Sequence, residues 1–111
     1  MLPFSAMRLS PAETDVLARF RGTLLDRFGP RLGRVVLFGS RARGEGHEAS
    51  DLDVLVTIRS ISPAERREVL DIAFDLEATS RLTLSPLVRD EGTWSFDSPL
   101  GREIERDGVP A

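Results

Sequence analysis

Two aspartates, Asp51 and Asp53, stand at the head of an apolar run where a β-strand is expected to begin. Aspartate is depleted in strands, and its carboxylate is costly to remove from water. Residues two apart in a strand project from the same face with Cα atoms roughly 7 Å apart, so both carboxylates can reach one ion. Without a cation they would repel each other, and Mg²⁺ prefers oxygen ligands of this kind. The spacing therefore predicts a magnesium site at Asp51 and Asp53.

A second group of chemically suited residues precedes this pair. Gly39 and Ser40 close another apolar run, and Arg41 and Arg43 follow them. A glycine that leaves a strand lets the backbone approach a ligand, and the N–H groups of such a turn attract phosphate. The serine hydroxyl adds a donor, and guanidinium groups bind phosphate oxygens through paired N–H groups. These four residues are therefore candidates for nucleotide binding.

Either group alone has an ordinary explanation. The aspartates could form a solvated strand start, with Ser50 and Asp51 in a turn, and a lone Gly-Ser dipeptide says little. Together, however, they place a phosphate-binding turn and a metal-binding pair on adjacent strands joined by a short basic loop. A metal–triphosphate complex requires both parts, so the combination favours nucleotide chemistry.

The helices that must support this arrangement are marked by a repeated start signal. The sequence SPAE occurs at 10–13 and again at 62–65. In each copy the serine can cap a helix, the proline suits the first helical position, and the glutamate can complete a capping box. Apolar residues at helical spacing after each copy predict helices over 11–28 and 63–79. A shorter helix is expected over 98–108, capped by a serine.

Apolar runs rich in β-forming residues predict three strands, over 34–39, 51–58 and 81–88. In the second strand, alternation places both aspartates on one face with Leu55 and Thr57. Pro86 in the third strand has no N–H group to donate, which indicates an edge position or a bulge.

The resulting order, α-β-β-α-β-α, predicts one α/β domain of the α+β type over residues 1–111. We expect a small mixed β-sheet with helices packed on one face, because 11 residues between the first two strands leave no room for a crossover helix. Phe74, Leu76 and Ile104 are expected in the core, with the alternative that part of this cluster is left for a partner.

Composition narrows the function further. The net charge is −3, which argues against salt-driven binding of DNA. No apolar run approaches the roughly 20 residues that span a bilayer, and the N-terminus is a poor signal peptide, so we expect a cytoplasmic protein without a membrane segment. Cysteine and tyrosine are both absent, which excludes a thiolate zinc site and a tyrosine or cysteine nucleophile.

The stretch GSRARGEGHEASDLDVLV resembles the signature of the DNA polymerase β-like nucleotidyltransferases, GS-x-A-R-G followed by S-D-x-D. It is most similar to the minimal nucleotidyltransferase branch. The resemblance implies that Gly39 and Ser40 bind the triphosphate, with Ser50 also at the nucleotide, and that Asp51 and Asp53 are catalytic ligands of Mg²⁺.

The resemblance also implies partners. Members of this branch are often encoded beside a HEPN-domain ribonuclease toxin, which they neutralise by binding it, by transferring AMP to it from ATP, or by both. A protein partner, and assembly of this chain with itself or with that partner, are therefore expected. The alternative to an adenylyltransferase is a catalytically impaired binding module that sequesters the toxin.

One feature departs from the pattern of active family members. They usually carry a third carboxylate on a later strand, which helps to bind metal and acts as general base. The strand expected here presents Thr83 and Ser85, and the first acids after it are Asp90 and Glu91. A hydroxyl brings no charge to a metal, so catalysis is less firmly predicted than nucleotide binding. Asp90 or Glu91 would have to fold back to fill the role.

Overall fold

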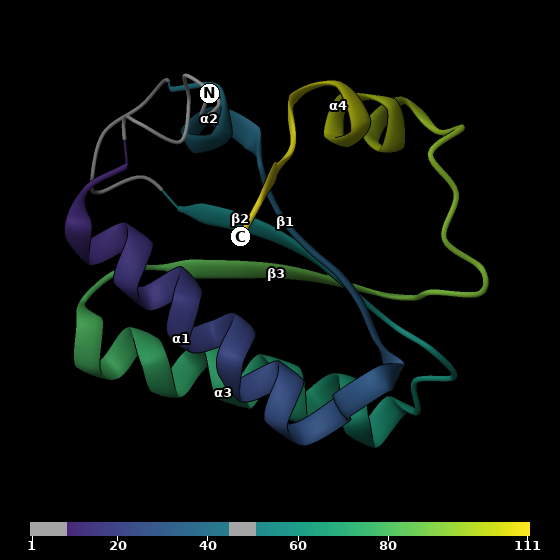
Figure 1. Cartoon of the computed structure of the whole chain (residues 1–111), viewed down its shortest axis with the longest axis horizontal. Helices are drawn as coiled ribbons and strands as arrows, with labels where there is room; N and C mark the ends of the chain where they lie inside the picture. The colour runs from purple at the N-terminus through teal and green to yellow at the C-terminus, as the bar shows by residue number, and fades with distance from the viewer. Residues whose placement is uncertain (1–8, 45–50) are drawn as a thin grey trace.

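The computed structural model describes residues 9–44 and 51–111, and it contains a four-stranded mixed sheet with strand order β3-β2-β1-β4 (Figure 1). β1 pairs antiparallel with both β2 and β4, and β2 pairs parallel with β3. The elements are α1 (Pro11–Phe28), η2 (Gly29–Arg31), β1 (Leu32–Phe38), α2 (Gly39–Ala42), β2 (Leu52–Ile58), α3 (Pro63–Ser80), β3 (Leu84–Asp90), α4 (Pro99–Asp107) and β4 (Val109–Pro110).

Helices α1 and α3 lie side by side on one face of the sheet, below it in Figure 1, and enclose the main core. That core joins apolar residues of both helices to one face of the strands, including Phe20, Leu24, Leu37, Val54 and Val56. Burial of these side chains is the main stabilising contribution, at roughly 1.5–3 kcal/mol for each large one. The remaining face of β2 carries Asp53, Leu55 and Thr57, as its alternation predicts.

The short helix α4 lies on that second face. Ile104 is buried, and a Cβ on Gly108 would lie 2.6 Å from Cγ1 of Val36. Val36 points away from the main core, because its neighbours Val35 and Leu37 belong to that core. The expected packing of helices on one face thus holds for α1 and α3, whereas α4 crosses to the other face, above the sheet in Figure 1.

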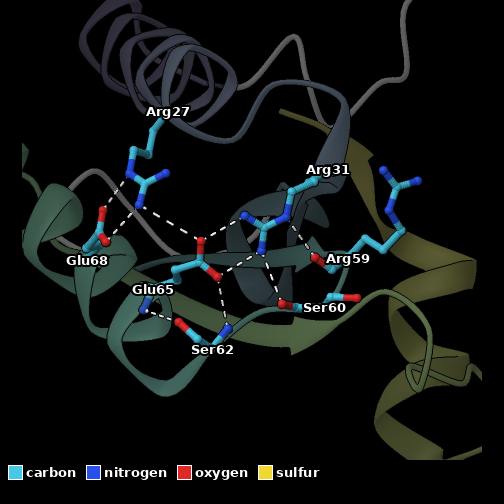
Figure 2. A network of polar contacts seen from close by, with 7 residues as sticks. All are labelled: Arg27, Arg31, Arg59, Ser60, Ser62, Glu65 and Glu68. Atoms are coloured by element: carbon cyan, nitrogen blue, oxygen red, sulfur yellow. Dashed lines mark hydrogen bonds and ion pairs between the residues drawn. The ribbon is translucent and has the colours of Figure 1, made fainter.

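Both SPAE segments form the capping boxes that the sequence predicts. Ser10 accepts the N–H of Glu13 while Glu13 accepts that of Ser10, and Ser62 and Glu65 do the same for α3. In each box the glutamate also binds an arginine at one end of β1. Glu65 binds Arg31, just before β1, through two hydrogen bonds of 2.8 Å, with Ser60 and Arg59 carbonyls adding to the network shown in Figure 2.

At the other end of β1, Glu13 binds Arg41 in α2 through hydrogen bonds of 2.6 and 2.9 Å. We call these two contacts the strand-end ion pairs. They tie the entrance of β1 to the first turn of α3 and the exit of β1 to the first turn of α1, so each helix holds one end of the strand.

Several predicted boundaries shift. The first strand covers Leu32–Phe38 rather than 34–39, because Gly39 already begins the one-turn helix α2, which the sequence pattern does not reveal. The third strand covers Leu84–Asp90 rather than 81–88, because Arg81 takes a left-handed conformation as the C-cap of α3. Strand β4 was not predicted.

Two packing predictions have opposite outcomes. Pro86 lies on β3, an edge strand, as predicted. The expectation that Phe74 is part of the core is wrong, since this side chain is 70% exposed, whereas Ile104 is buried. Among the residues that the structure describes, no helix is both long enough and apolar enough to cross a membrane.

Candidate functional site

Gly39 and Asp53 are in direct contact where β1 and β2 run side by side. Phe38 and Asp53 are Cα partners in the antiparallel ladder, so the turn after β1 begins beside the aspartate. Gly39 has a φ of +76°, and a Cβ at this position would lie 2.5 Å from Oδ2 of Asp53. The glycine is therefore required twice, for its backbone conformation and for the space its missing side chain leaves. The Gly-Ser turn and the acidic pair thus belong to one site.

Asp51 lies immediately before β2 and is exposed. The hydroxyl of Ser85 on the neighbouring strand β3 donates to Oδ2 of Asp51 at 3.4 Å, and Ser85 is also the residue in register with Asp53. The acidic pair therefore lies between the turn after β1 on one side and a hydroxyl of β3 on the other.

Asp53 has a perturbed acidity. Its partial burial raises the pKa of the carboxyl above its usual value, the nearby Asp51 raises it further, and Glu103 adds a smaller increase, while Arg43 lowers it. Two carboxylates held together in a partly desolvated place favour a bound cation, because a cation would offset both the burial and the repulsion.

Arg43 connects α2 to α4 at the edge of this site. Its Nη1 donates to Oε1 of Glu103 at 3.0 Å, and both side chains remain about one-third exposed. Because both groups influence the acidity of Asp53, Arg43 is a cation near the acidic pair and Glu103 is a third carboxylate in the neighbourhood. The predicted part of Arg43 in phosphate binding stays a prediction. No sequence pattern indicates Glu103, because its place depends on how α4 packs.

Arg41 has a different environment from Arg43. Its side chain is only 5% exposed and forms the strand-end ion pair with the fully buried Glu13. Burial opposes ionisation of Glu13, but hydrogen bonds from Arg41 and Ser10 hold the pKa of its carboxyl below the usual value. The described contact of Arg41 is therefore structural, and its predicted part in phosphate binding stays a prediction.

Asp90, the last residue of β3, and Glu91, which follows it, do not fold back to the site. Asp90 is in register with Ile58, five residues beyond Asp53 and Ser85 along the ladder, which corresponds to roughly 16–17 Å. The carboxylate of Glu91 accepts the hydroxyl hydrogen of Thr57 near the same far end of β2. Within residues 9–44 and 51–111, no three acidic or histidine side chains come close enough to share a metal ion. Ser50, the remaining nucleotide-binding candidate, lies outside the described residues.

A cavity of about 600 Å³ lies elsewhere, between α1 and the end of the chain at β4. Its lining includes Leu17, Leu37 and Val109, and Arg21 is the charged residue among its walls. A mainly apolar lining does not suit a triphosphate, which carries several negative charges. The size of this cavity therefore does not make it the nucleotide site.

Comparisons with known proteins agree with this geometry. The family model described as the nucleotidyltransferase domain matches residues 17–91. A Methanocaldococcus jannaschii protein named "Putative protein adenylyltransferase MJ0141" is 29% identical over 96 residues, which cover 86% of this chain and 94% of that protein.

Two solved structures are similar in fold. A structure described as a "putative minimal nucleotidyltransferase" has a TM-score of 0.57 and 27% identity, and the match covers 88% of this chain and 94% of that one. A crystal structure of a toxin-antitoxin with AMP-PNP has a TM-score of 0.58 at 22% identity, covering 83% of this chain and 69% of that one.

Proposed function

Because this chain belongs to the nucleotidyltransferase domain family, as a minimal nucleotidyltransferase of the polymerase β-like superfamily, we propose that it is a protein adenylyltransferase. In this proposal it binds ATP with Mg²⁺ in the cytoplasm and transfers AMP to a hydroxyl of a partner protein. The partner is a HEPN-type ribonuclease toxin, which the chain neutralises as its antitoxin.

The observation that carries the proposal is the contact between Gly39 and Asp53. It brings a turn suited to phosphate against an acidic pair suited to metal, with Arg43 at the edge. The similarity to named adenylyltransferases, and to a toxin-antitoxin solved with an ATP analogue, supports the choice of ATP and of a protein acceptor.

The residues present fit a divalent cation. The pKa of Asp53 is raised by its burial and by Asp51, and a bound cation would offset both effects. Asp51 and Asp53 would hold the ion, with the phosphates and water completing its preferred set of oxygen ligands. When bound, Mg²⁺ would neutralise charge that develops on the α-phosphate and the leaving pyrophosphate.

The chain's own groups would orient the nucleotide. The backbone at Gly39 and the hydroxyl of Ser40 would hold the terminal phosphates, because the turn begins against Asp53 and position 39 has no side chain. Arg43 would stabilise phosphate charge as a permanent cation, exchanging its contact with Glu103 for the phosphate oxygens. The partner supplies the attacking hydroxyl, and this chain has no tyrosine to serve as an acceptor.

The test uses the full chain, the protein encoded by its neighbouring gene, Mg²⁺ and ATP labelled on the α-phosphate. Label should appear on the neighbour, and the double variant Asp51→Asn/Asp53→Asn should remove it, because asparagine keeps the shape of the side chain but not its charge. Equal labelling by the double variant, with its fold verified by circular dichroism, would refute the assignment of the acidic pair.

A second candidate is a binding module without turnover. It is favoured by Ser85, which occupies the place beside Asp53 on β3 where a third carboxylate would complete the metal site. Protection of cells against the toxin separates the two functions. Full protection by the double asparagine variant indicates sequestration, whereas loss of protection with retained complex formation indicates chemistry.

A further inference from the structure

Helix α3 carries an apolar pair on its outer surface. Phe74 is 70% exposed and Leu70, one turn earlier, is 45% exposed. Residues four apart are neighbours on a helix, so the two side chains form one apolar patch. Within the described part of the chain, Phe74 is the one aromatic residue with an exposed side chain. Single exposed apolar residues are common on protein surfaces, whereas adjacent ones indicate a surface that binds a partner.

The patch lies on the side of α3 next to the edge strand β3, away from α1. This follows from its neighbours. Arg66 donates to the carbonyl oxygen of Val88 at 2.8 Å, and Glu77 accepts the N–H of Leu84 at 2.7 Å, whereas Glu68 on the other side of the helix binds Arg27 of α1.

The same contacts close the free edge of β3 to another strand. The outward-facing positions of β3 are 84, 86 and 88, since Thr83 uses its carbonyl toward β2. Glu77 occupies the N–H at 84, Pro86 has none, and Arg66 occupies the carbonyl at 88. A partner therefore meets this side of the molecule through the helix surface and not by extending the sheet.

The charges that flank the patch are self-complementary. Along the outer surface of α3, residues Arg67, Leu70, Phe74 and Glu77 follow at spacings of three, four and three, and so form one stripe. Within the described residues no carboxylate pairs with Arg67, and Leu84 donates to one carboxylate oxygen of Glu77. When a second copy of the stripe is laid antiparallel on the first, each Arg67 meets a Glu77 and each Leu70 meets a Phe74.

We propose that this stripe binds a second copy of the chain across a two-fold axis. The two α3 helices run antiparallel, Leu70 of each copy packs on Phe74 of the other, and Arg67 of each lies beside Glu77 of the other. A two-fold interface requires a self-complementary surface, and the stripe meets that requirement in both its apolar and its charged positions. This inference does not depend on the proposed enzymatic activity.

The experiment is sedimentation velocity of the full chain over a concentration series. The wild type should show a monomer–dimer equilibrium, and Phe74→Ser and Leu70→Ser should shift it to monomer. Leu25→Ser is the matched control, because Leu25 lies on α1 and is 46% exposed, almost the same as Leu70. It should leave the equilibrium unchanged. Arg67→Glu should weaken the dimer, and Arg67→Glu/Glu77→Arg should restore it.

The absence of native cysteine allows a geometric test. The double variant Arg67→Cys/Ala78→Cys should be cross-linked into dimers by a short bismaleimide, and Arg67→Cys alone should not. Position 78 adjoins position 77, which lies beside position 67 of the other copy only in the antiparallel arrangement. A wild type that is monomeric at its highest soluble concentration overturns the proposal. So does a dimer that Phe74→Ser leaves intact. If Phe74→Ser instead weakens only the complex with the neighbouring gene's protein, the patch serves that protein and the second-copy proposal fails.

Discussion

Substituting Gly39 by alanine tests the geometry of the site most directly. The residue has a φ of +76°, and an alanine there incurs about 1–2 kcal/mol of backbone strain. Its Cβ would also lie 2.5 Å from Oδ2 of Asp53, so the carboxylate must withdraw by about 0.9 Å to reach ordinary contact at 3.4 Å. A magnesium ion requires ligands close to 2.1 Å in near-ideal geometry, and a displacement of about 1 Å at a reacting centre costs roughly a hundredfold in rate.

Two effects of Gly39→Ala are therefore expected. The melting temperature should fall by about 4–8 °C for each kcal/mol of strain. Labelling of the partner should fall roughly a hundredfold, which corresponds to about 2.7 kcal/mol. The strain alone would not produce the second effect, so the two must be measured on the same protein, by thermal unfolding and by transfer from labelled ATP.

Gly29→Ala is the matched control. Gly29 also has a positive φ, of +55°, but no atom lies within 4 Å of the Cβ position. This variant should lose comparable stability and keep wild-type transfer below its melting temperature. If Gly39→Ala transfers AMP as well as Gly29→Ala does, Asp53 does not act from the position described, and the reasoning about the site is refuted.

Three further outcomes are expected. The pKa of Glu65 is lowered to about 2 by Arg31 and by the N–H of Ser62, so the unfolded chain binds more protons than the native one between about pH 4.5 and 2. Its contribution to stability is present above that window and is lost on acidification through it. Chemical denaturation at pH 7 and pH 3 should therefore show a smaller decrease for Glu65→Gln than for the wild type. Arg41→Met should cost roughly 3–5 kcal/mol in urea denaturation by leaving a buried charge unpaired, and a second substitution, Glu13→Gln, should recover part of that loss. Gly101→Ala should destabilise the protein even though alanine favours helix by about 1 kcal/mol, because its Cβ would lie 2.7 Å from a backbone atom, and an unchanged melting temperature would contradict this packing.

The sequence reveals local features of the fold well. Both capping boxes form between residues three apart, and their helices begin where the SPAE segments predict. The alternation around Asp53 also holds, because the face a strand residue occupies follows from its parity alone. Contact between the Gly39 turn and Asp53 follows from the antiparallel pairing of β1 and β2, and the short connection between these strands favours that pairing over a parallel one.

Features that depend on distant packing escape the sequence. Arg41 and Arg43 occupy similar positions in one arginine-rich segment, yet one is buried against Glu13 and the other reaches Glu103. Nothing local distinguishes them, since the difference is set by which helix approaches each residue. Phe74 is likewise indistinguishable from a core residue until the orientation of α3 is known, because helical spacing alone does not show which side faces the sheet.

The strand-end ion pairs couple local opening of the helices to the site. Glu13 lies in the first turn of α1, and helix ends open more readily than helix centres. Each opening of that turn breaks the two hydrogen bonds between Arg41 and Glu13, and so loosens one attachment of the chain segment that follows β1. The free energy needed to open the first turn of α1, which hydrogen exchange of its amides would measure, then also limits how rigidly the Gly39 turn is held. Glu13, which contacts no nucleotide in the proposed site, would in this way contribute to the affinity of the protein for the nucleotide.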